Sequence, residues 1–238
     1  MSVKSYSFKS DSNKFLSQHF QVKEFASISG NKLYTDKVLI DSSLISMLEN
    51  LYERLECTSI IVNSGYRFSN HDKSVGGNGY GQHTKGTAAD IVCRNKNGII
   101  NAKIVCCVAH ELGFGGVANI SAKYQSVHVD VRAGSKYRGD EIRGTNSIWK
   151  YNSKWTDFYK YWGISKSEIS KYLSDKPVIS VGDTVMILNG ACTYDGKKLA
   201  SFVFKNKYKV SQIKGDRAVI CQENTVIAAV NVRNLKKV

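Results

Sequence analysis

The stretch that most constrains the fold is Ser126–Arg132, in which polar and apolar residues alternate without exception. A period of two belongs to a β-strand, because successive side chains of a strand point to opposite faces. The three valines of this stretch therefore face a core, and His128, Asp130 and Arg132 share the opposite face. A chain with such a strand needs a sheet that packs on one face and leaves polar groups on the other.

A second polar group lies upstream, between Ser64 and Asp90. In this stretch, His83 and Asp90 lie at the two ends of one loop and strand segment, whereas His128 comes from a separate strand. Two histidines and a carboxylate are the ligand types of a catalytic zinc site, which leaves its fourth position to water. The three residues can converge without strain. Histidine and aspartate residues at such separations are common, however, so the spacing alone leaves structural roles open.

The composition is that of a globular protein with an affinity for polyanions. The chain has 238 residues, of which 42% are hydrophobic and 11% aromatic, and this excludes a wholly disordered chain. The formal charge of +14 attracts nucleic acid, anionic membranes and anionic wall polymers. The basic residues are spread along both halves, and no helix-turn-helix or RNP-like motif is present. We therefore favour wall polymers, or a role of the charge in solubility alone, over nucleic acid and expect no nucleic-acid partner.

Two helices and four strands are predicted in the first part of the chain. Asp41 and Asn101 are N-cap residues of the predicted helices, and Gly113 follows the second one. His110 ends that helix, and because position 114 is Phe it does not complete an H-E-x-x-H zinc motif. His19 is interpreted as a partly buried or surface residue. The predicted helices are 41–55 and 101–112, and the predicted strands are 57–63, 87–93, 114–120 and 126–132.

The pattern changes near Pro177, the only proline. Short alternating strands separated by Gly and Asp follow, and they predict a small β-barrel. We expect domains at 1–163 and 178–238 with a linker at 164–177. Residues 1–14 are expected to form a loose end or an added edge segment. The aromatic stretch 149–162 either packs as a closing helix or lines a groove, and packing is favoured.

Targeting and redox signals are few. The six cysteines form no C-x-x-C pair and are interpreted as buried free thiols. The N-terminus has no apolar leader, so we expect no signal peptide. No apolar run approaches 18 residues, so we expect no membrane span.

Several motifs occur in the order known from one family. SGYR at 64–67, VGG at 75–77, QHTKGTAADI at 82–91 and VHVDVR at 127–132 resemble peptidase family M15, the zinc D-Ala-D-Ala carboxypeptidases and endopeptidases, over about residues 15–135. The resemblance implies an α+β domain with a small antiparallel sheet and flanking helices, and peptidoglycan stem peptide as substrate. It also implies zinc bound by His83, Asp90 and His128, with Arg67 stabilising the oxyanion.

The general base is the main departure from that family. Many relatives have an acid three residues before the last zinc histidine, whereas this chain has Gln125, which cannot abstract a proton. Asp130 is the candidate for this role, either as the base or as the group that orients a ligand histidine, and the base is favoured by a small margin. Tyr66 and Gln82 are assigned to substrate binding.

The last 60 or so residues resemble bacterial SH3-like wall-binding modules. Tyr194 with Lys197 and Lys198 is a candidate contact with wall polymer, although solvated turn residues are an equal interpretation. A zinc peptidase joined to a wall-binding module implies a monomeric bacteriophage endolysin, held in the host cytoplasm until its release to the wall and bacteriolytic there. The alternative is a catalytically inactive, zinc-stabilised wall-binding protein.

Overall fold

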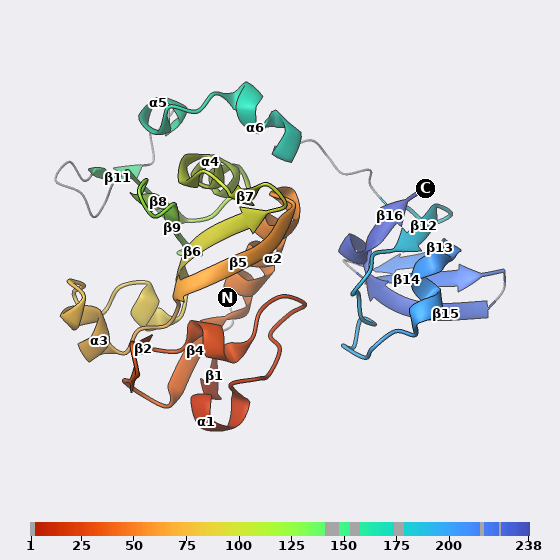
Figure 1. Cartoon of the computed structure of the whole chain (residues 1–238), viewed down its shortest axis with the longest axis horizontal. Coiled ribbons are helices and arrows are strands. Elements are labelled where there is room, and N and C mark those ends of the chain that lie inside the picture. Colours follow the sequence, from red (N-terminus) through yellow and green to blue (C-terminus); the bar gives the residue numbers. More distant parts are fainter. Residues whose placement is uncertain (1–2, 141–147, 153–157, 174–178, 215–216, 224) are drawn as a thin grey trace. The chain divides into compact units, whose positions relative to one another are not determined.

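The computed structural model describes residues 3–140, 148–152, 158–173, 179–214, 217–223 and 225–238. The chain divides into two compact units, Met1–Ser174 and Asp175–Val238, which are described separately (Figure 1). The predicted domain ends at 163 and 178 lie on either side of this division. No helix in the described ranges is long and apolar enough to cross a membrane.

The two long helices of the first unit begin at the predicted caps. Asp41 accepts a hydrogen bond from the backbone N–H of Ser43 at 2.7 Å, and Asn101 accepts one from Lys103 at 2.9 Å. Gly113 follows the second helix with φ of +90°, a conformation that favours glycine. The leucines of the first helix are buried in the core, as their spacing predicts. The helices of this unit are α1 (Phe8–Asp11), α2 (Ser42–Arg54), α3 (Ser69–Ser74), α4 (Ala102–Glu111), α5 (Phe158–Trp162) and α6 (Lys166–Leu173), with 3-10 turns η1 (Val22–Phe25) and η2 (His83–Lys85).

The main sheet has the strand order β11-β10-β8-β9-β6-β5, with the short β7 beside β6. Helix α4 packs against β8, β9 and β6, and α2 packs against β5 and α4 (Figure 1). The valines of Ser126–Arg132 are buried in the core, which confirms the packed face of this strand. The strands are β5 (Cys57–Ser64), β6 (Ala88–Asn95), β7 (Gly98–Ile99), β8 (Gly116–Ser121), β9 (Ser126–Asp130), β10 (Lys136–Asp140) and β11 (Ile148–Asn152).

The sheet is mixed, so the prediction of a purely antiparallel sheet is wrong at one pair. Strands β8 and β9 pair antiparallel, as expected for this sheet, but β10 runs parallel to β8. After Asp130 the chain crosses the end of β8 at Gly116 and pairs on its other side, where Tyr137 lies opposite Gly116. Because β10 starts at the same end as β8, it runs in the same direction. Local alternation in sequence carries no information about this crossing.

The N-terminal residues add a small edge structure to the first unit. Strand β1 (Val3–Ser7) pairs with β4 (Lys37–Asp41), and β2 (Ile28–Ser29) pairs with β3 (Lys32–Leu33). The added edge segment predicted within 1–14 is therefore present. The backbone N–H of Asp41 donates to the carbonyl of Gly86 at 2.9 Å, which ties β4 to the segment between His83 and Asp90.

The chain after β11 returns to the same core. Trp162 is buried, and its indole N–H donates to the carbonyl of Gly139 at 3.1 Å. Ile164 and Ile169 also belong to the first core, so α6 packs there although it falls within the predicted linker. Packing is thus the role of Trp162. Trp155, part of the same aromatic stretch, lies outside the described residues.

The second unit is a five-stranded antiparallel sheet with its own core. Its order is β15-β14-β13-β12-β16, and every neighbouring pair is antiparallel. The predicted β-strands are confirmed, but the predicted closed barrel is not found, because the described strands leave β15 and β16 as two separate edges. The strands are β12 (Thr184–Ile187), β13 (Lys207–Lys214), β14 (Arg217–Gln222), β15 (Thr225–Asn231) and β16 (Leu235–Lys237), with 3-10 turns η3 (Ser201–Lys205) and η4 (Val232–Asn234).

Candidate metal centre

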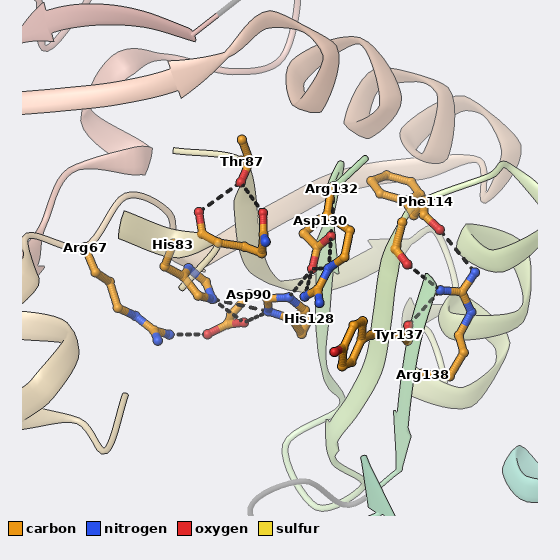
Figure 2. A network of polar contacts seen from close by, with 12 residues as sticks. Arg67, His83, Thr87, Asp90, Phe114, His128, Asp130, Arg132, Tyr137 and Arg138 are labelled. Carbon is orange, nitrogen blue, oxygen red and sulfur yellow. Dashed lines mark hydrogen bonds and ion pairs between the residues drawn. The ribbon is translucent and has the colours of Figure 1, made fainter. Parts of the chain in front are cut away.

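The three residues predicted as metal ligands meet on one face of the main sheet. Asp90 on β6 lies directly opposite His128 on β9 in the antiparallel register. Because residues opposite one another in a sheet point to the same face, their side chains are neighbours. His83 comes from the 3-10 turn that precedes β6, and its ring reaches the same point (Figure 2).

Three atoms of these side chains converge. His128 Nδ1 lies 2.9 Å and His83 Nε2 lies 3.2 Å from Asp90 Oδ1, and the two ring nitrogens are 3.2 Å apart. All three residues are buried, and each offers a ligand atom within 4.8 Å of the others. The ligand types match zinc, which binds histidine nitrogen and carboxylate oxygen.

In each histidine, the ring nitrogen that points away from the three converging atoms, here called the outer nitrogen, contacts a hydrogen-bond acceptor of the protein. His83 Nδ1 is 2.8 Å from the carbonyl oxygen of Gly65, and His128 Nε2 is 3.0 Å from Asp130 Oδ2. An N–H on each outer nitrogen leaves a lone pair on the inner nitrogen, which then faces a carboxylate oxygen and another lone pair. The two nitrogen lone pairs and the carboxylate oxygen repel one another unless a cation or a proton lies among the three atoms. The residues present therefore fit a metal ion.

The electrostatics of the group agree with this need for positive charge. Burial alone would raise the pKa of Asp90, but the neighbouring imidazoles of His83 and His128 outweigh it and hold the pKa well below its usual range. Burial alone would lower the pKa of His128, but the Asp130 and Asp90 carboxylates raise it to about 9. The site thus keeps Asp90 anionic and favours a cation beside it.

Asp130 is buried behind the ligand His128. Its side chain is 0% exposed, and besides His128 it bonds the guanidinium of Arg132, which lies over the ring of Tyr137 (Figure 2). Burial would raise the pKa of Asp130, but the hydrogen bonds from His128 and Arg132 lower it far below the usual value. A β-carbon at Gly116 would come within 2.0 Å of Asp130 Oδ2, so the glycine leaves the space that this carboxylate fills.

Arg67 lies on the other side of Asp90. Its Nη2 bonds Asp90 Oδ2, the oxygen that does not face the histidines, and its Nε donates to Ser64 Oγ at 2.7 Å (Figure 2). Its side chain is 11% exposed. The arginine predicted to stabilise an oxyanion is therefore beside the candidate metal position and also fixes one ligand.

Gln125, the residue at the position of the acid in many relatives, points elsewhere. Its Oε1 accepts a hydrogen bond from the backbone N–H of Ala102 at 2.6 Å, at the first turn of α4. Its backbone has φ of +53°, in the left-handed region. Gln125 therefore acts as a helix cap. No local pattern predicts this role, because the contact joins residues 23 positions apart.

The predicted substrate-binding residues have different surroundings. Tyr66 is 6% exposed and belongs to the first core. Gln82 accepts a hydrogen bond from Thr87 Oγ1 at 2.8 Å within the loop that carries His83. Tyr194 lies in the second unit, where its side chain is partly exposed.

The remaining histidines have structural partners. His110 Nδ1 accepts from the guanidinium of the buried Arg138 at 2.9 Å, and burial together with that cation lowers the pKa of His110 to about 4. His19 Nδ1 lies 2.7 Å from Glu49 Oε2, and its side chain is partly exposed. Both agree with the interpretations made from the sequence. His71 is buried, bonds Ser27 Oγ at 2.9 Å and stacks on Tyr34.

Asp72 is a residue of this region that the sequence patterns did not single out. It is buried on α3, and its Oδ1 lies 3.4 Å from Arg67 Nη1. A signal for it is present in the sequence, where Gly77 and Gly79 follow Asp72, since glycines allow a loop to approach a carboxylate closely.

Comparison with known proteins agrees with the geometry. Residues 18–130 match the model of the family described as Peptidase M15. Searches of curated proteins and of solved structures found no match. The matched range contains Arg67 and all three converging side chains. Residues 18–130 therefore match a Peptidase M15 domain, and the buried His83, Asp90 and His128 within it could bind a metal, which indicates a metallopeptidase.

Proposed function

We propose that the protein is a zinc-dependent peptidase that hydrolyses an amide bond in the stem peptide or the cross-link of bacterial peptidoglycan. The observation that carries the proposal is the convergence of His83 Nε2, Asp90 Oδ1 and His128 Nδ1 inside an M15 domain. A zinc ion bound there supplies a Lewis acid and lowers the pKa of a bound water to about 7.

The surrounding side chains have positioning and charge-stabilising roles in this proposal. Asp130 holds the ring of His128 through Nε2 and keeps Nδ1 free for the metal. The carbonyl of Gly65 does the same for His83. Arg67 fixes Asp90, and its guanidinium charge would stabilise the negative charge that develops on oxygen during amide hydrolysis.

We further propose that the second unit is an SH3-like module that binds the cell wall. Support comes from its small antiparallel sheet with a separate core and from the basic character of the chain. Tyr194 is its candidate contact with wall polymer. A second binding unit raises the local concentration of a catalytic domain at an insoluble substrate. Together the units agree with a bacteriophage endolysin that reaches the wall from the host cytoplasm.

The test is digestion of purified peptidoglycan. We expect new peptide termini, identified by mass spectrometry, to appear with zinc and to disappear when a chelator removes it. The variant His83→Ala is expected to lose both zinc and release, because one of three ligands is missing. His110→Asn is a control histidine variant outside the site, and it is expected to retain both. Release that persists after complete zinc removal would contradict the proposal.

A wall-binding protein without catalysis is the second candidate. It is favoured by two observations: Gln125 caps α4, and Asp130, the carboxylate that bonds the ring of His128, is fully buried. In that case the same assay would give zinc-bound protein that is retained on peptidoglycan but releases no peptide.

A further inference from the structure

Asp72 joins a glycine-rich loop to the arginine that fixes Asp90. Its side chain is 6% exposed. Its Oδ1 lies 3.4 Å from Arg67 Nη1, and its Oδ2 accepts a hydrogen bond from the backbone N–H of Gly79 at 2.9 Å. Arg67 is therefore held between two carboxylates, Asp72 and the proposed metal ligand Asp90.

The loop lies directly on this carboxylate. The backbone N–H of Gly77 donates to the carbonyl of Asp72 at 2.8 Å, and a β-carbon at Gly77 would come within 2.1 Å of Asp72 Oδ2. Gly77 has no positive φ, so its lack of a side chain serves this contact and not an unusual backbone conformation. The loop then leads through Gly81 into the turn that carries His83.

We propose that Asp72 is a positioning residue for the metal centre, which acts through Arg67 on the orientation of Asp90. The guanidinium is planar, and its three nitrogens bond Ser64, Asp72 and Asp90 in a fixed fork. Loss of the Asp72 contact leaves the plane free to tilt about Ser64, and Asp90 Oδ1 then moves relative to the two histidines. This inference rests on the proposed metal site.

The expected size of the effect follows from metal sites in general. Groups that orient ligands from outside typically change metal affinity by about 10- to 100-fold when they are lost. Asp72 is one step further away than a group that bonds a ligand directly. We therefore expect a loss of zinc affinity of about tenfold for Asp72→Asn, which keeps the size and an acceptor but removes the charge that faces Arg67.

The experiment measures the zinc dissociation constant of the full chain by competition with a chromophoric chelator, and the visible spectrum of the cobalt-substituted protein. Gly77→Ala disturbs the contact between Asp72 and Arg67 from the side of the loop, because the new methyl group displaces the Asp72 carboxylate. Gly81→Ala is the matched control: its β-carbon would meet only Asn78 Oδ1 at 3.8 Å, and its φ is not positive. We expect weaker zinc binding and an altered cobalt spectrum for Gly77→Ala, and wild-type behaviour for Gly81→Ala.

A double-mutant cycle separates positioning from simple stability. In an Asp72→Ala background there is no carboxylate to displace, so Gly77→Ala should add no further loss of zinc affinity. Thermal unfolding of the zinc-free variants is recorded in parallel. Lower unfolding temperatures with unchanged zinc affinity and cobalt spectrum in Asp72→Asn and Gly77→Ala would overturn the inference alone. Absence of zinc binding by the wild-type protein would overturn the proposed function and the inference with it.

Discussion

A carboxylate that bonds a histidine can accept a proton during catalysis or hold the ring in place, and burial distinguishes these roles at Asp130. The side chain has no exposed surface, bonds Arg132, and has a pKa far below its usual value. A base needs access to water and enough affinity for a proton. The buried Asp130 lacks that access, so its burial supports the positioning role, and its assignment as the base stays a prediction.

The substitution Asp130→Asn tests this choice. Asparagine keeps an acceptor for His128 Nε2 but removes the charge, so we expect zinc affinity to fall by about tenfold. At saturating zinc, peptidoglycan release should then recover to within a few-fold of wild type. Zinc affinity and release rate are measured on the same preparation. Full zinc occupancy with no release would instead identify Asp130 as the base.

Single residues of the centre differ in how far sequence could identify them. His83, Asp90 and His128 were predicted because ligand types and motif order are local properties of the sequence. Asp72 was not predicted, because its role depends on a contact with Arg67 that folding creates. The same holds for the backbone carbonyl of Gly65, which any residue could supply at that position.

At the scale of elements, helix α4 depends on a residue outside itself. Two acceptors satisfy N–H groups of its first turn: Asn101 bonds Lys103, and Gln125 bonds Ala102. The free N–H groups at a helix start are costly when they are left without partners. The turn before β9 is thereby attached to the helix that packs on the opposite face of the sheet from the metal centre.

Substitutions at Gln125 should therefore affect stability and not activity. We expect Gln125→Ala to lower the free energy of unfolding by about 1 kcal/mol, as for the loss of an N-cap. Gln125→Glu should be as stable as wild type or more so, since a negative charge is favourable at a helix N-terminus. Denaturant unfolding and peptidoglycan release are measured for both. A rise in activity of Gln125→Glu would mean that this position reaches the reacting groups after all.

Elements with local signals were predicted well, and those fixed by tertiary contacts were not. Helices α2 and α4 and the β8–β9 hairpin follow from caps and periodicity. Helix α3 is not among the predicted helices, because six residues carry too little periodicity to indicate a helix. The parallel β10 depends on where the chain crosses the end of β8, which no local pattern encodes.

For the whole molecule, the matched family range is smaller than the folding unit. The match ends at Asp130, yet β10 pairs with β8, and Trp162 and Ile169 are buried in the same core. The first compact unit extends to Ser174. A domain boundary at 130 would expose an edge of the central sheet and a large part of the apolar core to water.

Truncation tests this conclusion. We expect residues 1–174 to unfold in one cooperative transition and to bind zinc like the full chain. Residues 18–130 should lack such a transition, because β10, one of the two partners of β8, and the core residues Trp162 and Ile169 are missing. Circular dichroism during heating and zinc competition give the two readouts. A cooperative, zinc-binding fragment 18–130 would show that the later elements are dispensable.

The metal centre also depends on residues near the N-terminus, through Gly86. This glycine follows His83 by three residues, has φ of +72°, and lies so close to β4 that a β-carbon there would come within 2.3 Å of the carbonyl oxygen of Leu39. The backbone between two of the three proposed ligands, His83 and Asp90, therefore packs closely against strand β4, which precedes it in the sequence. Because synthesis runs from the N-terminus, β4 leaves the ribosome before the segment between His83 and Asp90 that packs against it, and His128 follows last.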